Sequence, residues 1–255
     1  MSIDAKLAAV DLADKHLEDG QRTPQAEGGD TCPVTGLTAS GKTCPFASVG
    51  SPENLQEVDD EALRKDINAR MVYLKDFVNF TRHDEDAIRS VGPLINELIP
   101  DVVDALYSKL FEFDITKQVF MQRNDGFDGP IPTKLDDLTL DSAQLVYRKV
   151  FMKNWCRRLL SSDFSSPKTF TWMDKVGIMH TGVKSFKHRT HVSPLHVPYR
   201  DCALTLGWVG TVLQTATLQL PEDKLSMQGK IDAVGAINKI LWIQNDLFAR
   251  HYIDE

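Results

Sequence analysis

The segment Trp172-Met173-Asp174-Lys175-Val176-Gly177-Ile178-Met179-His180 contains the pattern from which the fold can best be predicted. Its inward-facing residues recur at i, i+3, i+4 and i+7, the spacing of one helix face: Met173, Val176, Gly177 and His180. The pattern therefore predicts an imidazole on the apolar face of a helix, near the helix end. A buried imidazole needs a hydrogen bond or a metal ion. Periodicity alone favours a core histidine with satisfied hydrogen bonds and leaves metal ligation as the alternative.

The chain from about residue 59 onward shows helical periodicity almost throughout. No segment alternates apolar and polar residues between turn signals, so we expect no strands. The sequence predicts one all-α domain over residues 59–255. Its helices are expected at 61–80 (with a break near Arg70), 81–113, 141–160, 167–180, 199–220 and 221–253.

Several helix ends and kinks are marked by characteristic residues. Thr81, with Asp84 three residues later, resembles a capping box. Ser166-Pro167 supplies an N-cap followed by proline at the first helical position. Pro93 and Pro100 predict kinks or breaks in the second helix, because proline lacks the amide hydrogen that continues the helical bonding.

The composition is that of an ordinary globular protein, with 42% hydrophobic and 25% charged residues over 255 positions. A net charge of −7 gives no electrostatic reason to expect nucleic acid or an anionic membrane as partner. The four scattered cysteines, and an N-terminus without a continuous apolar segment, favour a reduced cytoplasmic setting. Motifs typical of nucleotide-dependent enzymes and hydrolases are missing from the sequence.

The stretch 202–220 carries no charged residue over 19 positions, which is nearly the length needed to span a bilayer. Its threonines and glutamines dilute the hydrophobicity, and polar groups are costly in hydrocarbon. We therefore expect this helix to be buried in the domain or in a subunit interface, and not to cross a membrane.

Tyr107 is a second polar group on an apolar helical stripe. Alone it is typical of a core tyrosine whose hydroxyl reaches the surface or a carbonyl group. In a helical chain that also carries His180, the alternative is a hydroxyl that donates to a ligand on the far side of a haem iron. Tyr147 and Phe151 lie one turn apart on another helix, where they either line the same cavity or belong to an aromatic core.

Taken in order, these segments resemble the protoglobins, which are relatives of the globin domains of globin-coupled sensors. The resemblance covers roughly residues 60–253. It is carried by Phe80-Thr81-Arg82-His83-Asp84-Glu85-Asp86, Val103-Asp104-Ala105-Leu106-Tyr107, Tyr147-Arg148-Lys149-Val150-Phe151, Val176-Gly177-Ile178-Met179-His180 and Val197-Pro198-Tyr199-Arg200.

The resemblance implies a globin-like helical sandwich with an additional N-terminal helix, a b-type haem, and binding of O2, CO or NO. Matched residue by residue, His180 corresponds to the proximal iron ligand, Tyr107 to the distal tyrosine and Phe151 to a phenylalanine of the distal wall. The resemblance also implies a homodimer packed through the last two helices, which suits the uncharged stretch 202–220.

Three positions depart from the family pattern. Leu106 stands where a tryptophan is common beside the distal tyrosine, and Thr205 replaces a phenylalanine of the penultimate helix that lines the haem pocket. Tyr147 adds a second phenol one turn before Phe151. These departures bear on ligand affinity, so affinities of relatives are not transferable to this chain.

The leading hypothesis is a haem protein that binds diatomic gases reversibly, as a sensor or carrier. One alternative is haem enzymology, such as NO dioxygenation or peroxide chemistry, although no reductase module is expected. The other is a cofactor-free helical interaction module in which His180 and Tyr107 are core residues. No output module is expected after the last helix, so a signal would pass through dimer contacts or through the N-terminal extension.

The first 58 residues form that extension, which is rich in Gly, Ser, Thr and Pro and is expected to be largely flexible. It contains Cys32-Pro33 and Cys44-Pro45, each preceded by threonine. Cys-Pro pairs in flexible segments resemble haem-regulatory motifs, in which a thiolate binds haem weakly. Ordinary loop cysteines are the favoured interpretation, with a zinc or redox pair as a further alternative.

Overall fold

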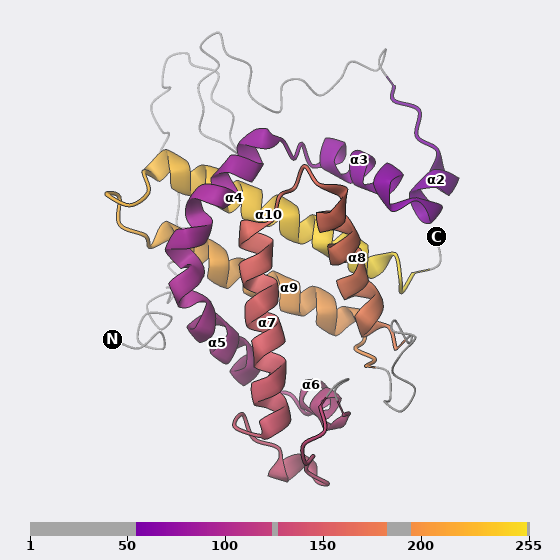
Figure 1. The fold of residues 1–255 in the computed structure, drawn as a ribbon, viewed down its shortest axis with the longest axis vertical. Coiled ribbons are helices and arrows are strands. Elements are labelled where there is room, and N and C mark those ends of the chain that lie inside the picture. The colour runs from indigo at the N-terminus through magenta and orange to yellow at the C-terminus, as the bar shows by residue number, and fades with distance from the viewer. Residues whose placement is uncertain (1–54, 124–126, 183–194, 254–255) are drawn as a thin grey trace, which may run out of the picture. The chain divides into compact units, whose positions relative to one another are not determined.

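The structure is a computed structural model that describes residues 55–123, 127–182 and 195–253. Val58–Glu255 forms one compact unit, which is the part discussed below (Figure 1). The prediction of a flexible extension with two Cys-Pro pairs falls almost entirely on residues outside the described ranges.

The all-α prediction is confirmed. The elements are α2 (Asp60–Lys65), α3 (Ile67–Phe77), α4 (Arg82–Ile95), η1 (Asn96–Leu98), α5 (Ile99–Phe111), α6 (Asp114–Gln118), η2 (Val119–Met121), η3 (Leu135–Asp137), α7 (Ala143–Ser161), α8 (Pro167–His180), α9 (Tyr199–Leu218) and α10 (Met227–Ala249). Within the described ranges there is no strand, and the isolated bridge found there pairs Thr181 with His196. None of the helices in those ranges combines the length and apolarity needed to cross a membrane.

The predicted capping box is confirmed at the start of α4, where the Thr81 amide donates to Asp84 Oδ2 at 2.7 Å. Ser166 is the N-cap of α8 and Pro167 its first residue, as the sequence predicts. Pro93 lies inside α4, and Pro100 lies in the first turn of α5. The expected kink region is therefore the short η1 turn that joins these two helices.

Two helix boundaries differ from the prediction. The first helical region breaks at Asp66 and not near Arg70, because the Asp66 carboxylate caps α3 by accepting from the Asn68 amide at 2.8 Å. The last helix begins at Met227 and not at 221, since Ser226 is its N-cap and accepts from the Gly229 amide. In both places a capping side chain determines the boundary.

The core is built around α10, which packs against α4, α8 and α9, while α7 covers α4 and α5 (Figure 1). Two glycines permit close backbone approaches. A Cβ on Gly92 of α4 would lie 2.6 Å from the Leu160 carbonyl oxygen of α7. A Cβ on Gly177 of α8 would overlap the Leu247 carbonyl of α10. This explains why a glycine occupies the inward face of the segment that carries His180.

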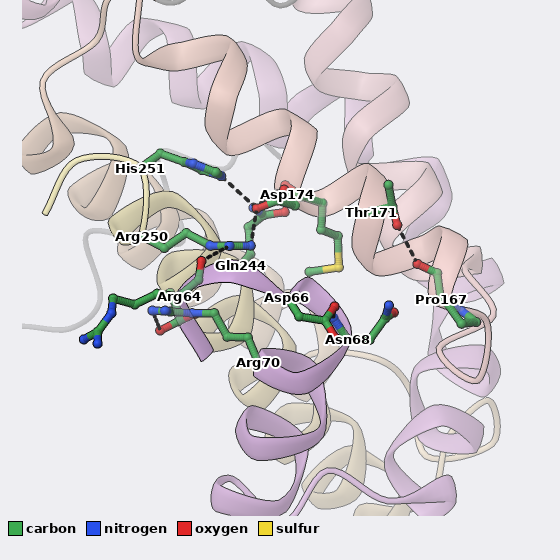
Figure 2. Close-up of polar contacts among 12 residues, drawn as sticks. Arg64, Asp66, Asn68, Arg70, Pro167, Thr171, Asp174, Gln244, Arg250 and His251 are labelled. Carbon is green, nitrogen blue, oxygen red and sulfur yellow. Dashed lines mark hydrogen bonds and ion pairs between the residues drawn. The ribbon is translucent and has the colours of Figure 1, made fainter. Parts of the chain in front are cut away.

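A cluster of charged side chains ties α3 and α8 to α10 (Figure 2). Arg70 of α3 is almost fully buried and makes a bidentate ion pair with Asp246 of α10, at 2.6 and 2.8 Å. On α8, Asp174 Oδ1 accepts from Arg250 at 3.1 Å and lies 2.7 Å from His251 Nε2. Such charge-assisted bonds are stronger than neutral ones. They hold α8 at a defined position along α10.

Arg250 also reaches α2, because its Nη2 donates to the Arg64 carbonyl at 2.9 Å (Figure 2). The same guanidinium therefore contacts α8 and α2. This contact docks the N-terminal helical segment against the helix that carries His180.

Gly177→Ala is expected to lower the free energy of unfolding by about 1–3 kcal/mol, the usual cost of overpacking a tight contact. The added methyl group forces α8 away from the Leu247 carbonyl. Chemical denaturation of the purified protein measures the change. Gly235→Ala on α10 is the matched control, because a Cβ there meets nothing within 4 Å. Equal stabilities for the two variants would contradict the proposed close approach.

Candidate functional site

His180 is the last residue of α8, and its ring packs edge-on against Phe248 of α10 with centroids 5.2 Å apart. Its Nδ1 lies 2.7 Å from the Val176 carbonyl oxygen. A carbonyl oxygen can only accept a hydrogen bond, so in this arrangement Nδ1 carries the proton and donates it. In the neutral ring Nε2 is then an unprotonated nitrogen with a free lone pair.

The surroundings of His180 favour its neutral form. Burial lowers the pKa of the imidazole, the hydrogen bond to Val176 opposes this shift, and the positive charge of Arg148 lowers the pKa further. A neutral imidazole is the form that ligates metals. The hydrogen bond from Nδ1 to the backbone carbonyl fixes the orientation of the ring, as is typical of metal-bound histidines.

No hydrogen bond to His180 Nε2 comes from the residues that the structure describes. These residues also contain no group of three or more His, Cys, Asp or Glu side chains that could hold a metal ion. In this part of the chain His180 is therefore a candidate single ligand and not a member of a multi-residue site. A single protein ligand suits a haem iron, because the porphyrin supplies the four equatorial nitrogens.

Tyr107 lies on α5 with only 7% of its surface exposed. Its ring packs against Phe120, with centroids 5.4 Å apart, and Lys149 Nζ lies 6.0 Å from the ring centroid. Burial raises its pKa well above the usual range, so the hydroxyl stays protonated and can donate. No hydrogen-bond partner for this hydroxyl is found among the described residues. The carbonyl acceptor that the core-tyrosine interpretation offers for this hydroxyl is thus not found in the described residues.

Arg148 of α7 connects the two residues electrostatically. Its charge lowers the pKa of Tyr107 as well as that of His180. The Phe120 ring also lies between Arg148 and Tyr107, with the guanidinium Cζ 5.2 Å and the Tyr107 ring centroid 5.4 Å from its centroid. Sequence reasoning did not select Arg148. It could have been found from its spacing, because it lies on the same helical face as the buried Gln144 and Leu145.

Tyr147 and Phe151 lie on a neighbouring face of α7 that the described residues leave partly open. Their rings meet edge to face with centroids 4.9 Å apart, and Phe127 packs against Tyr147 at 5.6 Å. Phe151 is 52% exposed, so it does not belong to the buried core. One turn further along, Trp155 has a buried indole nitrogen without a hydrogen-bond partner. These aromatic residues form an apolar face that is partly covered within the described structure and open at Phe151.

The remaining predicted positions are less closely connected to this group. Thr205 lies on α9 and is partly buried. Leu106 is 2% exposed and belongs to the hydrophobic core. The structure therefore brings Tyr107 and Arg148 together around Phe120, and pairs Tyr147 with Phe151 on another face of α7. His180 lies against Phe248 of α10, and Arg148 lowers its pKa.

Comparisons with known proteins agree with this architecture. The Protoglobin family model matches residues 67–255. Among solved structures, the globin domain of a Geobacter sulfurreducens globin-coupled sensor matches with a TM-score of 0.53 and 17% sequence identity, covering 72% of this chain and 98% of that chain. No curated protein matches. The chain therefore belongs to the Protoglobin family and has an all-α globin-like fold with an additional N-terminal helical segment.

Proposed function

We propose that this protein is a haem-binding globin that binds diatomic gases reversibly, as a sensor or carrier, with His180 as the iron ligand. The observation that carries the proposal is the His180 ring itself. Its Nδ1 donates to Val176, which leaves an unprotonated Nε2 at the end of α8. Membership of the Protoglobin family supports the same reading.

The residues of the site fit a b-type haem. The neutral imidazole of His180 would hold the iron through Nε2, and the partly open face with Tyr147 and Phe151 would offer apolar surface to the porphyrin. When bound, the haem supplies an iron with an open position at which O2, CO or NO can bind. The Val176 carbonyl orients the imidazole and increases its basicity as a ligand.

On the other side we assign Tyr107 the role of hydrogen-bond donor to the gas. The Tyr107 hydroxyl is protonated because burial raises its pKa. The Phe120 ring, which packs against the Tyr107 ring, limits the movement of that ring. Phe151 would exclude water from this side as part of the distal wall. Tyr147 would offer a second hydroxyl beside it, and Thr205 of α9 would leave more room than the larger residue common in the family.

We also propose that two copies of the chain pair through α9 and α10. These helices form a groove of about 340 Å³ lined in part by Leu206, Gly210 and Leu241. Large apolar side chains project beside it, with Leu204 and Trp242 more than half exposed. Exposed apolar surface of this kind is typical of subunit interfaces.

Protein purified with haem should show an intense Soret band that shifts under CO, and His180→Ala should lose most of its bound haem because the axial ligand is removed. Absorption spectra and haem content measure both effects. His83→Ala, at an exposed position of α4, should behave like the native protein. Unchanged haem retention in His180→Ala would refute the ligand assignment. A native protein that takes up no haem would favour the cofactor-free module.

Tyr107→Phe should raise the O2 dissociation rate by about tenfold, the effect of losing one hydrogen bond worth about 1–1.5 kcal/mol. The CO dissociation rate should change less, because bound CO carries less negative charge than bound O2 and gains less from a hydrogen-bond donor. Stopped-flow ligand replacement measures both rates. Tyr147→Phe tests the second phenol under identical conditions. The donor role belongs to Tyr147 if only that variant loses O2 faster.

Trp242→Glu should convert the dimer to a monomer of 28.6 kDa, because it places a charge on the proposed apolar interface. Light scattering after size exclusion measures the mass. Phe77→Glu on α3 is the control, since Phe77 is even more exposed but does not line the groove between α9 and α10. A native monomer, or a dimer that survives Trp242→Glu, would argue against this interface.

A further inference from the structure

Arg148 carries a positive charge that forms a cation–π contact with the Phe120 ring but no ion pair among the described residues. The residue is only 7% exposed, and its Nε is buried without a hydrogen-bond partner. Its Nη2 donates to the Gln122 carbonyl at 2.9 Å, which is a neutral acceptor. No carboxylate of the described residues forms an ion pair with it. Burial lowers its pKa to about 10, so the side chain is still charged at neutral pH.

A buried, unpaired charge is costly, so its presence calls for an explanation. Hydrogen bonding between α7 and the segment after α6 does not depend on Arg148 alone. Gln144, one turn earlier, donates from Nε2 to the Phe120 and Gln122 carbonyls, at 2.7 Å each. A polar but neutral side chain thus already holds that backbone. This favours a role for the charge of Arg148 itself.

The position of the guanidinium relates it to the gas-binding side of the site. Its Cζ lies 5.2 Å from the centroid of the Phe120 ring, and the same ring packs 5.4 Å from that of Tyr107. The guanidinium is thus one aromatic ring away from Tyr107, the residue assigned to the bound gas. The other cation near the Tyr107 ring, Lys149, is paired with Asp104 at 3.0 Å, whereas Arg148 has no carboxylate partner among the described residues.

We propose that Arg148 determines ligand selectivity by favouring small anionic ligands, such as azide, over neutral ones at the iron held by His180. The inference rests on the proposed haem function and deepens it. For a separation on the order of 10 Å and an effective dielectric constant near 20, Coulomb's law gives roughly a tenfold change in the affinity for a monovalent anion per unit charge. A neutral ligand gains little from the same charge.

The test compares azide binding to the ferric protein with CO binding to the ferrous protein, both followed by absorption spectroscopy. Arg148→Met removes the charge and keeps much of the volume. It should weaken azide binding about tenfold and change CO affinity by less than about twofold. Arg148→Lys keeps the charge and should recover most of the azide affinity. Arg157→Met removes the same charge from an exposed position of α7 and should leave both ligands unaffected.

A readout without haem separates this role from structural support. Thermal unfolding of the haem-free Arg148→Met protein should occur at a temperature no lower than that of the native protein, because a buried unpaired charge has been removed. A large fall in that temperature, or an equal loss of azide and CO binding, would assign Arg148 to structural support and overturn the proposal.

Failure of this inference can be distinguished from failure of the proposed function. If haem and CO bind normally but azide affinity is the same in native protein and Arg148→Met, the selectivity role is wrong and the haem function stands. If the native protein takes up no haem, the proposed function fails and the inference fails with it.

Discussion

The packing of α8 against α10 is the constraint on which the candidate site depends. Three contacts follow one another along this interface: Asp174 with His251, Gly177 with the Leu247 carbonyl, and the His180 ring with Phe248. The first is charged, the second is possible because glycine has no side chain, and the third is aromatic. Together they fix both the position of α8 and the rotation that turns His180 inward. The tautomer of His180 then follows from its own helix, through the Val176 carbonyl.

α7 presents two different environments on neighbouring faces. One of its faces is buried and polar, with Gln144 and Arg148 holding the backbone after α6. The neighbouring face carries the aromatic pair Tyr147 and Phe151 and is partly open. A charge and an apolar surface are thus placed close together on a single helix. This combination suits a site that binds a flat apolar group and a small polar ligand.

Much of the fold could be predicted from sequence, because caps and periodicity are local signals. The capping box at Thr81, the start of α8 at Ser166-Pro167 and the helical class of the domain are all confirmed. The predicted break near Arg70 is wrong: the helix breaks at Asp66, where the aspartate cap of α3 competes with helix continuation over a single residue. Arg148 was missed because a charged residue is ordinarily expected at the surface. Its burial results from tertiary contacts with Phe120 and Gln122, which periodicity does not reveal.

The central claim is that Nε2 of His180 is the axial ligand of a haem iron, and resonance Raman spectroscopy of the ferrous, ligand-free protein tests it most directly. The account predicts an iron–histidine stretching band that shifts when histidine carries the heavy nitrogen isotope. The same band should be absent from His180→Ala, even when haem is supplied in excess. An isotope-insensitive spectrum, or an unchanged band in that variant, would contradict the account.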